Sequence, residues 1–398
     1  MTGPAVTGPF GLGTALAERE QAGLLRNRIA TDGASGGRLR VAGREYLNFS
    51  ANDYLGLADH PAIKTAFNAG IERYGAGSGA SPLVTGYSRA HQQLEETLAE
   101  WLGVEAVLLF NCGFSANQAV LKALLGKEHL LWQDKLNHAS LQEMGSQLPC
   151  KMKRFAHNDM AALERQLEPN RGLIVSEGVF SMDGDQGPWA ELTTLAARSG
   201  NWLMIDDAHG LGVLGAEGRG TLAAQGVPPA SVHIQMGTFG KALGVAGAFI
   251  GGSRELVEYL VNFARHYVYS THMPAAQACA VSKSIELVRA ADESRAHLGQ
   301  LIARFRQGAK EQGWQLGASD TPIQPLLVGE SSVALQLAER LRERGVWVSA
   351  IRPPTVPVGT ARLRITLSAA HREQDVDRLL DALGVCPPAT TLGEAHHG

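Results

Sequence analysis

Residues 232–244 read VHIQMGTFGKALG, a β-rich apolar run that leads into a glycine-rich segment carrying one lysine, Lys241. Short runs of the same kind recur along the chain, and helical patterns such as SANQAVLKALL and ELTTLAARSG separate them. The predicted strands cover residues 106–110, 172–180, 202–209, 232–239 and 247–252. This alternation predicts an α/β fold with a mostly parallel central sheet that is covered by helices.

The length of 398 residues predicts more than one domain, because a single hydrophobic core stops growing below that size. We expect an N-terminal arm (1–48), a large domain with the central sheet (49–280) and a smaller C-terminal α/β domain (281–386). One long helical stretch begins at about Pro274 and leads into the C-terminal domain, where further strand and helix patterns follow. The ends, about 1–15 and 387–398, are rich in Gly, Pro, Ala and Thr, so we expect them to fray, with 387–398 as a disordered tail.

Charge and composition exclude several classes of protein. The 36 Lys and Arg residues against 39 Asp and Glu give a net charge of -3, which predicts binding neither to nucleic acid nor to an acidic membrane. The N-terminus lacks a basic segment, and no run approaches the ~18 apolar residues of a membrane span. The four cysteines are far apart and form no CxxC pair, which indicates reduced thiols and no zinc site. We therefore expect a soluble cytoplasmic protein.

In an open α/β sheet, ligands bind beyond the carboxyl ends of the strands. After strand 106–110, Gly113 and Phe114 precede a helix whose free N–H groups could hold an anion, although this stretch taken alone favours an ordinary turn with a serine cap. The apolar residues 202–205 lead into Asp206 and His209. Aspartates there are common in turns, and a metal site is a weak alternative because no second histidine or carboxylate cluster stands at ligand spacing. We expect no metal.

Lys241 belongs to no nucleotide-binding motif. A P-loop needs G-x-x-x-x-G-K-[ST], but position 235 is Gln and position 242 is Ala. The glycine-rich segments at 75–81 and 210–215 lack the strand and helix that a dinucleotide fingerprint requires. The remaining interpretation is a lysine nucleophile whose pKa is lowered by burial, so that its neutral amine forms a Schiff base with an aldehyde.

Pyridoxal 5'-phosphate supplies such an aldehyde, and its other needs are an anion site, a carboxylate beside the ring nitrogen and a donor to the phenolate oxygen. The sequence offers a candidate for each of them. Gly113, Phe114 and Thr238 would bind the phosphate, Asp206 the ring nitrogen and His209 the phenolate. His138, in DKLNHASL, could stack on the ring, although a lone histidine there is more often a cap or a packing residue.

These motifs resemble the α-oxoamine synthases of the fold type I pyridoxal-phosphate enzymes. TFGKALG and DDAHG are typical of that group, and AIRPPTVPVGTARLR is more particular to the branch that serves biotin biosynthesis. The resemblance covers residues from about 20 to 384. Further matching stretches are YLNFSANDYLGL, GSGASPLVTGYSRAHQQLEETLAEWLG, LNHASL, EGVFSMDGD, IDDAHGLGVLGAEGRG, TFGKALGVAGAF and FARHYVYSTHMP.

The resemblance assigns roles to individual residues of the large domain, which would bind the cofactor. The expected catalytic residues are Lys241, His138, Asp206 and His209. For the cofactor, Lys241 would form the Schiff base, Asp206 would pair with the ring nitrogen, and His138 would stack on the ring. His209 and Ser181 would lie near the phenolate oxygen. The phosphate would be bound by Gly113, Phe114 and Thr238, and by Thr271 of the neighbouring subunit. Cys112 stands where relatives often carry a hydroxyl residue.

For the substrates, the resemblance makes Arg352 the partner of the amino-acid carboxylate, with Arg26, Asn52, His138 and Thr355 lining the site. It implies a homodimeric acyltransferase that condenses L-alanine with a pimeloyl thioester, carried on CoA or on acyl carrier protein, and releases CO2. Alternatives are a member that uses glycine with acetyl-CoA or succinyl-CoA, and an aminotransferase. A cofactor-binding regulatory domain is a further alternative, although no helix-turn-helix segment or basic patch is visible.

Overall fold

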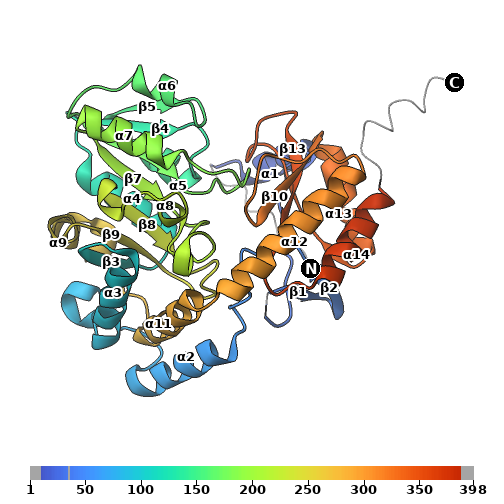
Figure 1. Ribbon diagram of the computed structural model, residues 1–398, viewed down its shortest axis with the longest axis horizontal. Helices are drawn as coiled ribbons and strands as arrows, with labels where there is room; N and C mark the ends of the chain where they lie inside the picture. Colours follow the sequence, from blue (N-terminus) through green and yellow to red (C-terminus); the bar gives the residue numbers. More distant parts are fainter. Residues whose placement is uncertain (1–9, 35, 387–398) are drawn as a thin grey trace.

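A seven-stranded sheet forms the centre of the larger of two lobes in the computed structural model, which describes residues 10–34 and 36–386 (Figure 1). All neighbouring strands are parallel except the penultimate strand at one edge, which runs antiparallel to both of its neighbours. This confirms the expected mostly parallel sheet. Across the sheet the strands are β3 (Ala106–Phe110), β9 (Ala248–Gly252), β8 (Ile234–Thr238), β7 (Trp202–Asp206), β6 (Gly172–Glu177), β4 (Leu130–Asp134) and β5 (Lys151–Phe155).

Helices cover this sheet, and its central strands are therefore buried and apolar rather than alternating. β4, for example, is buried along its whole length. The helices of the larger lobe are α2 (Pro61–Tyr74), α3 (Arg89–Leu102), α4 (Gly113–Leu124), α5 (Ala139–Gln147), α6 (Met160–Glu164), α7 (Trp189–Ser199), α8 (Thr221–Ala224), α9 (Arg254–Phe263), α10 (Arg265–Val268) and α11 (Ala275–Arg289).

The smaller lobe contains two three-stranded sheets. Its helices are α12 (Asp292–Glu311), which runs from the larger lobe into the smaller one, α13 (Ser331–Glu343) and α14 (Glu373–Gly384) (Figure 1). One sheet is antiparallel and has the order β10 (Ile323–Gly329), β13 (Ala361–Thr366), β12 (Ser349–Ile351). The other has the order β1 (Arg38–Val41), β2 (Arg44–Asn48), β11 (Val346–Trp347).

The N-terminal region takes part in the smaller lobe. β2 pairs in parallel with β11, and Leu47 is opposite Val346 in the register. The residues expected as an arm therefore supply two strands to a sheet that a C-terminal strand completes. Helix α1 (Leu12–Gln21) begins inside the region that was expected to fray, and none of its residues is buried. Residues 1–9 and the expected tail 387–398 lie outside the described residues.

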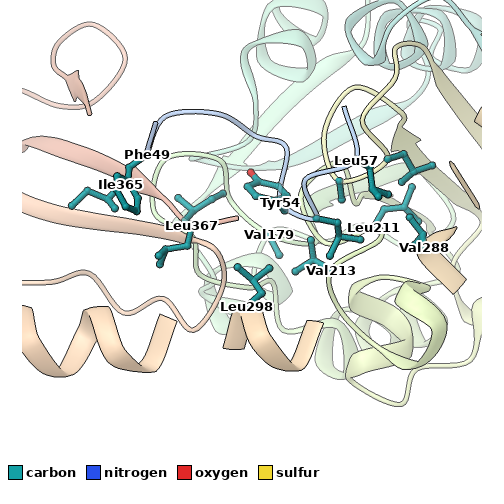
Figure 2. Packing of buried hydrophobic residues seen from close by; sticks show 14 of the residues in the cluster. Phe49, Tyr54, Leu57, Val179, Leu211, Val213, Val288, Leu298, Ile365 and Leu367 are labelled. Atoms are coloured by element: carbon teal, nitrogen blue, oxygen red, sulfur yellow. The ribbon is translucent and has the colours of Figure 1, made fainter. Parts of the chain in front are cut away.

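A hydrophobic core continues from one lobe into the other. The segment after β2 supplies Phe49, Tyr54 and Leu57, each buried, and it passes between the lobes (Figure 2). In Figure 2, Phe49 lies beside Ile365 of β13, whereas Leu57 lies on the side of the larger lobe. The two lobes therefore share one core around the segment that connects them.

The helical stretch after Pro274 is two helices, α11 and α12, separated at Ala290 and Ala291. Asp292 and Glu293 occupy the first turn of α12, where acidic side chains favour a new helix N-terminus. The border expected at 280/281 falls inside α11, which packs against α2 and α3. Within the described residues, no helix is both long enough and apolar enough to cross a membrane.

Candidate active site

Three neighbouring parallel strands end at one edge of the sheet and deliver polar side chains to it. Glu177 ends β6, Asp206 ends β7, and Thr238 ends β8 three residues before Lys241. A cavity of about 170 Å³, here called the cofactor cavity, lies at this edge. Its lining residues are Gly113, Phe114, Asn117, His138, Ser140, Glu177, Asp206, Ala208, His209, Met236, Thr238 and Lys241.

Two neighbouring aspartates have different surroundings. Asp206 lines the cofactor cavity, and its Oδ2 accepts a hydrogen bond from Asn117 Nδ2 (2.8 Å). Asp207 is directed elsewhere, because its carboxylate accepts bonds from the N–H (2.7 Å) and hydroxyl (2.6 Å) of Thr221. Burial raises the pKa of Asp207 to about 7, against the lowering effect of the Thr221 bonds. Of this pair, Asp206 is therefore the carboxylate available to a ligand.

His209 is buried and held by a tyrosine. Its Nδ1 lies 2.6 Å from the hydroxyl of Tyr54. Burial lowers the pKa of His209 well below its usual value, and the nearby Lys241 and Arg364 lower it further. Burial also raises the pKa of Tyr54 to about 12, so the phenol keeps its proton and shares a hydrogen bond with Nδ1. This bond leaves Nε2 as the ring nitrogen for a ligand, and Nε2 is a donor in the tautomer whose Nδ1 accepts from Tyr54.

Lys241 is partly buried and lies three residues after β8. Burial lowers the pKa of its amine to about 8, and the negative charges of Asp206 and Glu177 oppose that shift. Near neutral pH an appreciable fraction of the amine is therefore unprotonated, which is the form that acts as a nucleophile or base. Glu177 is itself buried, and burial followed by the charge of Asp206 raises its pKa well above the usual value.

The N-terminus of α4 opens toward the same cavity. Gly113 and Phe114 begin the helix, and no side chain caps it, so N–H groups of the first turn remain available to an anion. His138 caps α5, with its Nδ1 2.8 Å from Ser140 Oγ, and lies edge to face with Phe114. Burial and the charge of Lys241 lower the pKa of His138, while Asp206 raises it.

A larger cavity of about 860 Å³, here called the interlobe cavity, adjoins the first at His138. Segments of both lobes line it, including Ser181 from the larger lobe and Thr355 from the smaller one. Arg26 also lines it and donates from Nη2 to Thr355 Oγ1 (3.1 Å). The expected substrate residues Arg26, His138 and Thr355 are thus brought together, and Ser181 faces this cavity rather than the smaller one.

Asn52 and Arg352 line neither cavity. Asn52 Oδ1 accepts hydrogen bonds from Arg364 Nη1 (3.1 Å) and from the Tyr54 hydroxyl (3.2 Å), so it belongs to the group around His209. The guanidinium of Arg352 instead donates to the backbone carbonyls of Gly23 and of Leu25 (3.4 Å), next to Arg26.

Thr271 also lies outside both cavities. Its carbonyl accepts a hydrogen bond from Asn111 (2.8 Å), one residue before Cys112. Together with Cys112 it lines a third cavity of about 120 Å³, behind the N-terminus of α4. Thr238, in contrast, is in the cofactor cavity, where its hydroxyl donates to Gly247 (2.8 Å) and accepts from Gly240 N–H (3.3 Å).

The residues of the cofactor cavity fit pyridoxal phosphate. An amine, a carboxylate and an uncapped helix N-terminus supply the three functions that the aldehyde, the ring nitrogen and the phosphate require. Two oxygens of lining residues, Asn117 Oδ1 and Glu177 Oε1, are buried without a hydrogen-bond partner in the described part of the chain. Within residues 10–34 and 36–386, no group of three His, Cys, Asp or Glu side chains is placed to hold a metal ion.

Four residues of this region were not anticipated from the sequence: Tyr54, Asn117, Glu177 and Arg364. Glu177 ends a predicted strand and Asn117 lies one helical turn after Gly113, so position alone could have indicated both. Tyr54 and Arg364 reach His209 from segments more than 150 residues away in either direction. No local pattern predicts such contacts.

Known proteins share this fold and much of this sequence. The sequence matches the family Aminotransferase class I and II over residues 44–383. It is 88% identical to 8-amino-7-oxononanoate synthase of Aeromonas hydrophila and 86% identical to that of Aeromonas salmonicida, with all of each chain covered. The solved serine palmitoyltransferase of S. paucimobilis with bound PLP and myriocin superimposes with a TM-score of 0.89 at 25% identity, covering 96% of this chain and 98% of that one.

A partly buried lysine and a buried carboxylate at the carboxyl edge of this sheet, on a fold shared with pyridoxal-phosphate-bound enzymes, define a pyridoxal-phosphate-dependent transferase of fold type I. The chain belongs to the aminotransferase class I and II family and, within it, to the 8-amino-7-oxononanoate synthases.

Proposed function

We propose that this enzyme condenses L-alanine with a pimeloyl thioester and releases CO2 and the carrier thiol, giving 8-amino-7-oxononanoate for biotin biosynthesis. The observation that carries the proposal is 88% identity over the whole length to a synthase of that name. The cavity geometry supports it, because Lys241, Asp206 and His209 meet at one sheet edge beside a cavity large enough for a second substrate.

Bound pyridoxal phosphate supplies an aldehyde for amines and a protonated ring that withdraws electrons from the amino-acid Cα. Asp206, oriented by Asn117, would hold the proton of the ring nitrogen. His209 would donate from Nε2 to the phenolate oxygen, because Tyr54 occupies its Nδ1. The first turn of α4 and the Thr238 hydroxyl would hold the phosphate, and His138 would cover one face of the ring.

Lys241 would move the Cα proton of the bound amino acid. Its lowered pKa, about 8, leaves neutral amine available to accept that proton and later to return it. The interlobe cavity would receive the acyl thioester, with Arg26 and Thr355 on its wall. For the amino-acid carboxylate we propose two arginines: Arg352, which the sequence indicates, and Arg364, which the geometry favours because it bonds Asn52 in the group around His209.

The experiment that tests the proposal measures kcat/KM for L-alanine and glycine, each with pimeloyl-, succinyl- and acetyl-CoA, and compares pimeloyl-CoA with pimeloyl acyl carrier protein. We expect L-alanine with a pimeloyl thioester to be the best pair. One methyl group separates alanine from glycine by roughly 10- to 200-fold at most, whereas several methylenes of the acyl chain add up. If acetyl-CoA with glycine is the best pair, the proposed substrates are wrong and the glycine-using alternative holds.

We further propose a homodimer in which Thr271 serves the partner's phosphate site. Three large side chains near Thr271 support a dimer, because they leave apolar surface uncovered in the single chain. Leu83, Val84 and Tyr269 are 51%, 74% and 70% exposed, and their segments are in contact. Light scattering should report a dimer, and an active monomer would contradict the proposal. Mixing Lys241→Ala with Thr271→Ala subunits should restore activity, because each hybrid has one site that carries neither change.

The cytoplasm is the proposed location of this enzyme. All four cysteines are free thiols, as is usual in a reducing compartment. Fractionation of cells that produce the protein at its natural level tests the assignment, and recovery in an oxidising compartment would contradict it.

A further inference from the structure

The loop of residues 178–187, between β6 and α7, begins next to the cofactor cavity and lines the interlobe cavity. Glu177, directly before it, lines the cofactor cavity, whereas Ser181 and Met182 line the interlobe cavity. Within the loop, Phe180 N–H donates to Asp185 O (2.9 Å) and Gly184 N–H donates to Phe180 O (2.8 Å). Any shift of this loop would therefore change the wall of the cavity that we assign to the acyl substrate.

The smaller lobe binds one side of the loop. Arg364 Nε donates to the carbonyl of Ser181 (2.7 Å), and Arg362 pairs with Asp183. The hydroxyls of Ser319 and Thr321 both donate to the carbonyl of Gly184, at 3.0 and 2.9 Å. These contacts fix the loop relative to the smaller lobe alone.

The larger lobe holds the loop through several contacts. Asn158 Nδ2 donates to Asp185 Oδ2 (3.1 Å) and to Gln186 O (3.0 Å), and Gln225 Nε2 donates to Gly187 O (2.9 Å). The contact that involves two carboxylates is made by an imidazole. His157 Nε2 lies 2.6 Å from Asp185 Oδ2 of the loop, and its Nδ1 lies 3.0 Å from Asp134 Oδ1 at the end of β4. Asp134 is fully buried and also accepts from the N–H of Leu136, two residues before His138. The three side chains, here called the Asp134–His157–Asp185 clasp, thus connect the loop with the segment that carries His138.

The geometry requires the clasp histidine to be charged. A carboxylate accepts hydrogen bonds, so an imidazole that bonds one carboxylate through each nitrogen must carry a proton on both. The charged groups acting on the ring are Asp134 and Asp185, and Phe180 meets it edge to face. Burial disfavours the imidazolium, but the two carboxylates outweigh burial and raise the pKa of His157 to about 10.

We propose that the Asp134–His157–Asp185 clasp is a positioning device for the acyl-substrate site, holding loop 178–187 and the His138 segment in register across the interlobe cavity. His157 touches no substrate in this assignment and acts through the loop. Asp134 makes the device sensitive to loss of the imidazolium, because a fully buried carboxylate that loses its charged partner is strongly disfavoured.

The test uses the holoenzyme with His157→Gln, with Asp185→Asn as a milder change that keeps shape and removes charge. His129→Gln is the matched control, a part-exposed histidine beside Glu128 that lies outside the clasp. Hydrogen exchange is followed over residues 178–187, and KM is measured separately for the acyl thioester and for L-alanine. The kinetic measurement rests on the proposed function, whereas the exchange measurement does not, so failure of one is distinguishable from failure of the other.

In both clasp variants we expect exchange to accelerate about tenfold within 178–187 and not in the β6–β8 strands, since a local contact is lost. The KM for the acyl thioester should rise roughly tenfold. The kcat and the KM for L-alanine should each change less than about twofold, which is the pattern expected when ground-state positioning is lost. Unchanged exchange in the loop, exchange that rises throughout the protein, or an unchanged acyl KM would each overturn the proposal.

The pH dependence of stability provides a further measurement. Because the folded-state pKa of His157 is raised to about 10, its stabilisation is complete below about 6.5 and is lost as the pH rises through 10. The difference in Tm between the unchanged enzyme and His157→Gln should therefore be largest near pH 6 and shrink steadily toward pH 10. A difference that grows with pH would mean that the imidazole is not held as a cation.

Discussion

The cofactor cavity and the interlobe cavity differ in how the chain builds them. The first measures about 170 Å³ and is lined by residues between Gly113 and Lys241, all from the larger lobe. The second measures about 860 Å³ and takes its walls from both lobes and from Arg26 near the N-terminus. The groups that we propose to perform the chemistry thus lie at one sheet edge, whereas the groups expected to select the acyl substrate lie where separate segments meet. The comparison predicts that changes in the first cavity affect kcat and that changes in the second affect KM.

The largest effect is expected from Lys241→Ala. Loss of the lysine amine that lines the cofactor cavity should lower kcat by at least about a thousandfold without unfolding the protein. The measurements are steady-state turnover and the visible absorbance of the holoenzyme, which should disappear. Lys127→Ala, on an exposed loop, is the control. Near-normal kcat in Lys241→Ala would remove the lysine from the mechanism.

Asp206→Asn and Asp207→Asn form the next comparison. Asp206→Asn should lower kcat by about a hundredfold, because a neutral amide stabilises the protonated ring poorly. Asp207→Asn should instead lower thermal stability with a much smaller change in kcat, since Asp207 bonds Thr221 and does not line the cavity. Turnover and Tm are measured on both variants. The opposite pattern would assign the cofactor contact to Asp207.

Arg352→Gln and Arg364→Gln sharpen the comparison at the border between the cavities. Arg364 is buried, bonds Asn52 and acts on the pKa of His209, so its loss should raise the KM for L-alanine by roughly tenfold or more. The guanidinium of Arg352 donates to backbone carbonyls in the segment before Arg26. Its loss should therefore raise the KM for L-alanine less than loss of Arg364 does, and it should change the KM for the acyl thioester as well. A larger effect of Arg352→Gln on alanine would make it the carboxylate partner.

The smallest effect concerns the pH at which cofactor-free protein takes up pyridoxal phosphate. Because the pKa of Lys241 is lowered to about 8, the rate of covalent attachment should rise with pH up to about 8 and then level off. Glu177→Gln removes a charge that opposes this lowering, so the levelling should move to lower pH and attachment at pH 7 should become a few-fold faster. Stopped-flow absorbance measures the rate, and a shift to higher pH would contradict the assignment.

The sequence predicted the cofactor cavity better than the interlobe cavity, for a physical reason. Asp206, His209, Thr238 and Lys241 follow apolar runs that are recognisable strands, and parallel strands bring their ends to one edge. Seven of the nine expected cofactor-binding residues accordingly line one cavity: Gly113, Phe114, His138, Asp206, His209, Thr238 and Lys241. Their roles stay predictions.

The interlobe region depends on contacts between distant segments, which local periodicity does not encode. The strand pattern around Arg364 does not distinguish it from other strand residues in the sequence. In the structure its guanidinium donates hydrogen bonds to Ser181 and Asn52. Ser181 and Thr271 likewise lie outside the cofactor cavity, the first on a loop that both lobes hold and the second behind α4. The break between α11 and α12 was missed because apolar spacing alone did not reveal the new N-terminus at Asp292.

The pairing of β2 with β11 also sets an order of events at the ribosome. The strands of the seven-stranded sheet are complete once residue 252 has emerged. β2 can pair early with β1, but its other edge has to wait for Val346 and Trp347, nearly 300 residues after it. We therefore expect the larger lobe to form on the nascent chain while residues 38–48 have not yet joined the complete sheet of the smaller lobe. A chain stalled before Val346 should lose residues 38–48 to a protease and keep its central sheet, and protection of that segment would show that it finds a partner earlier.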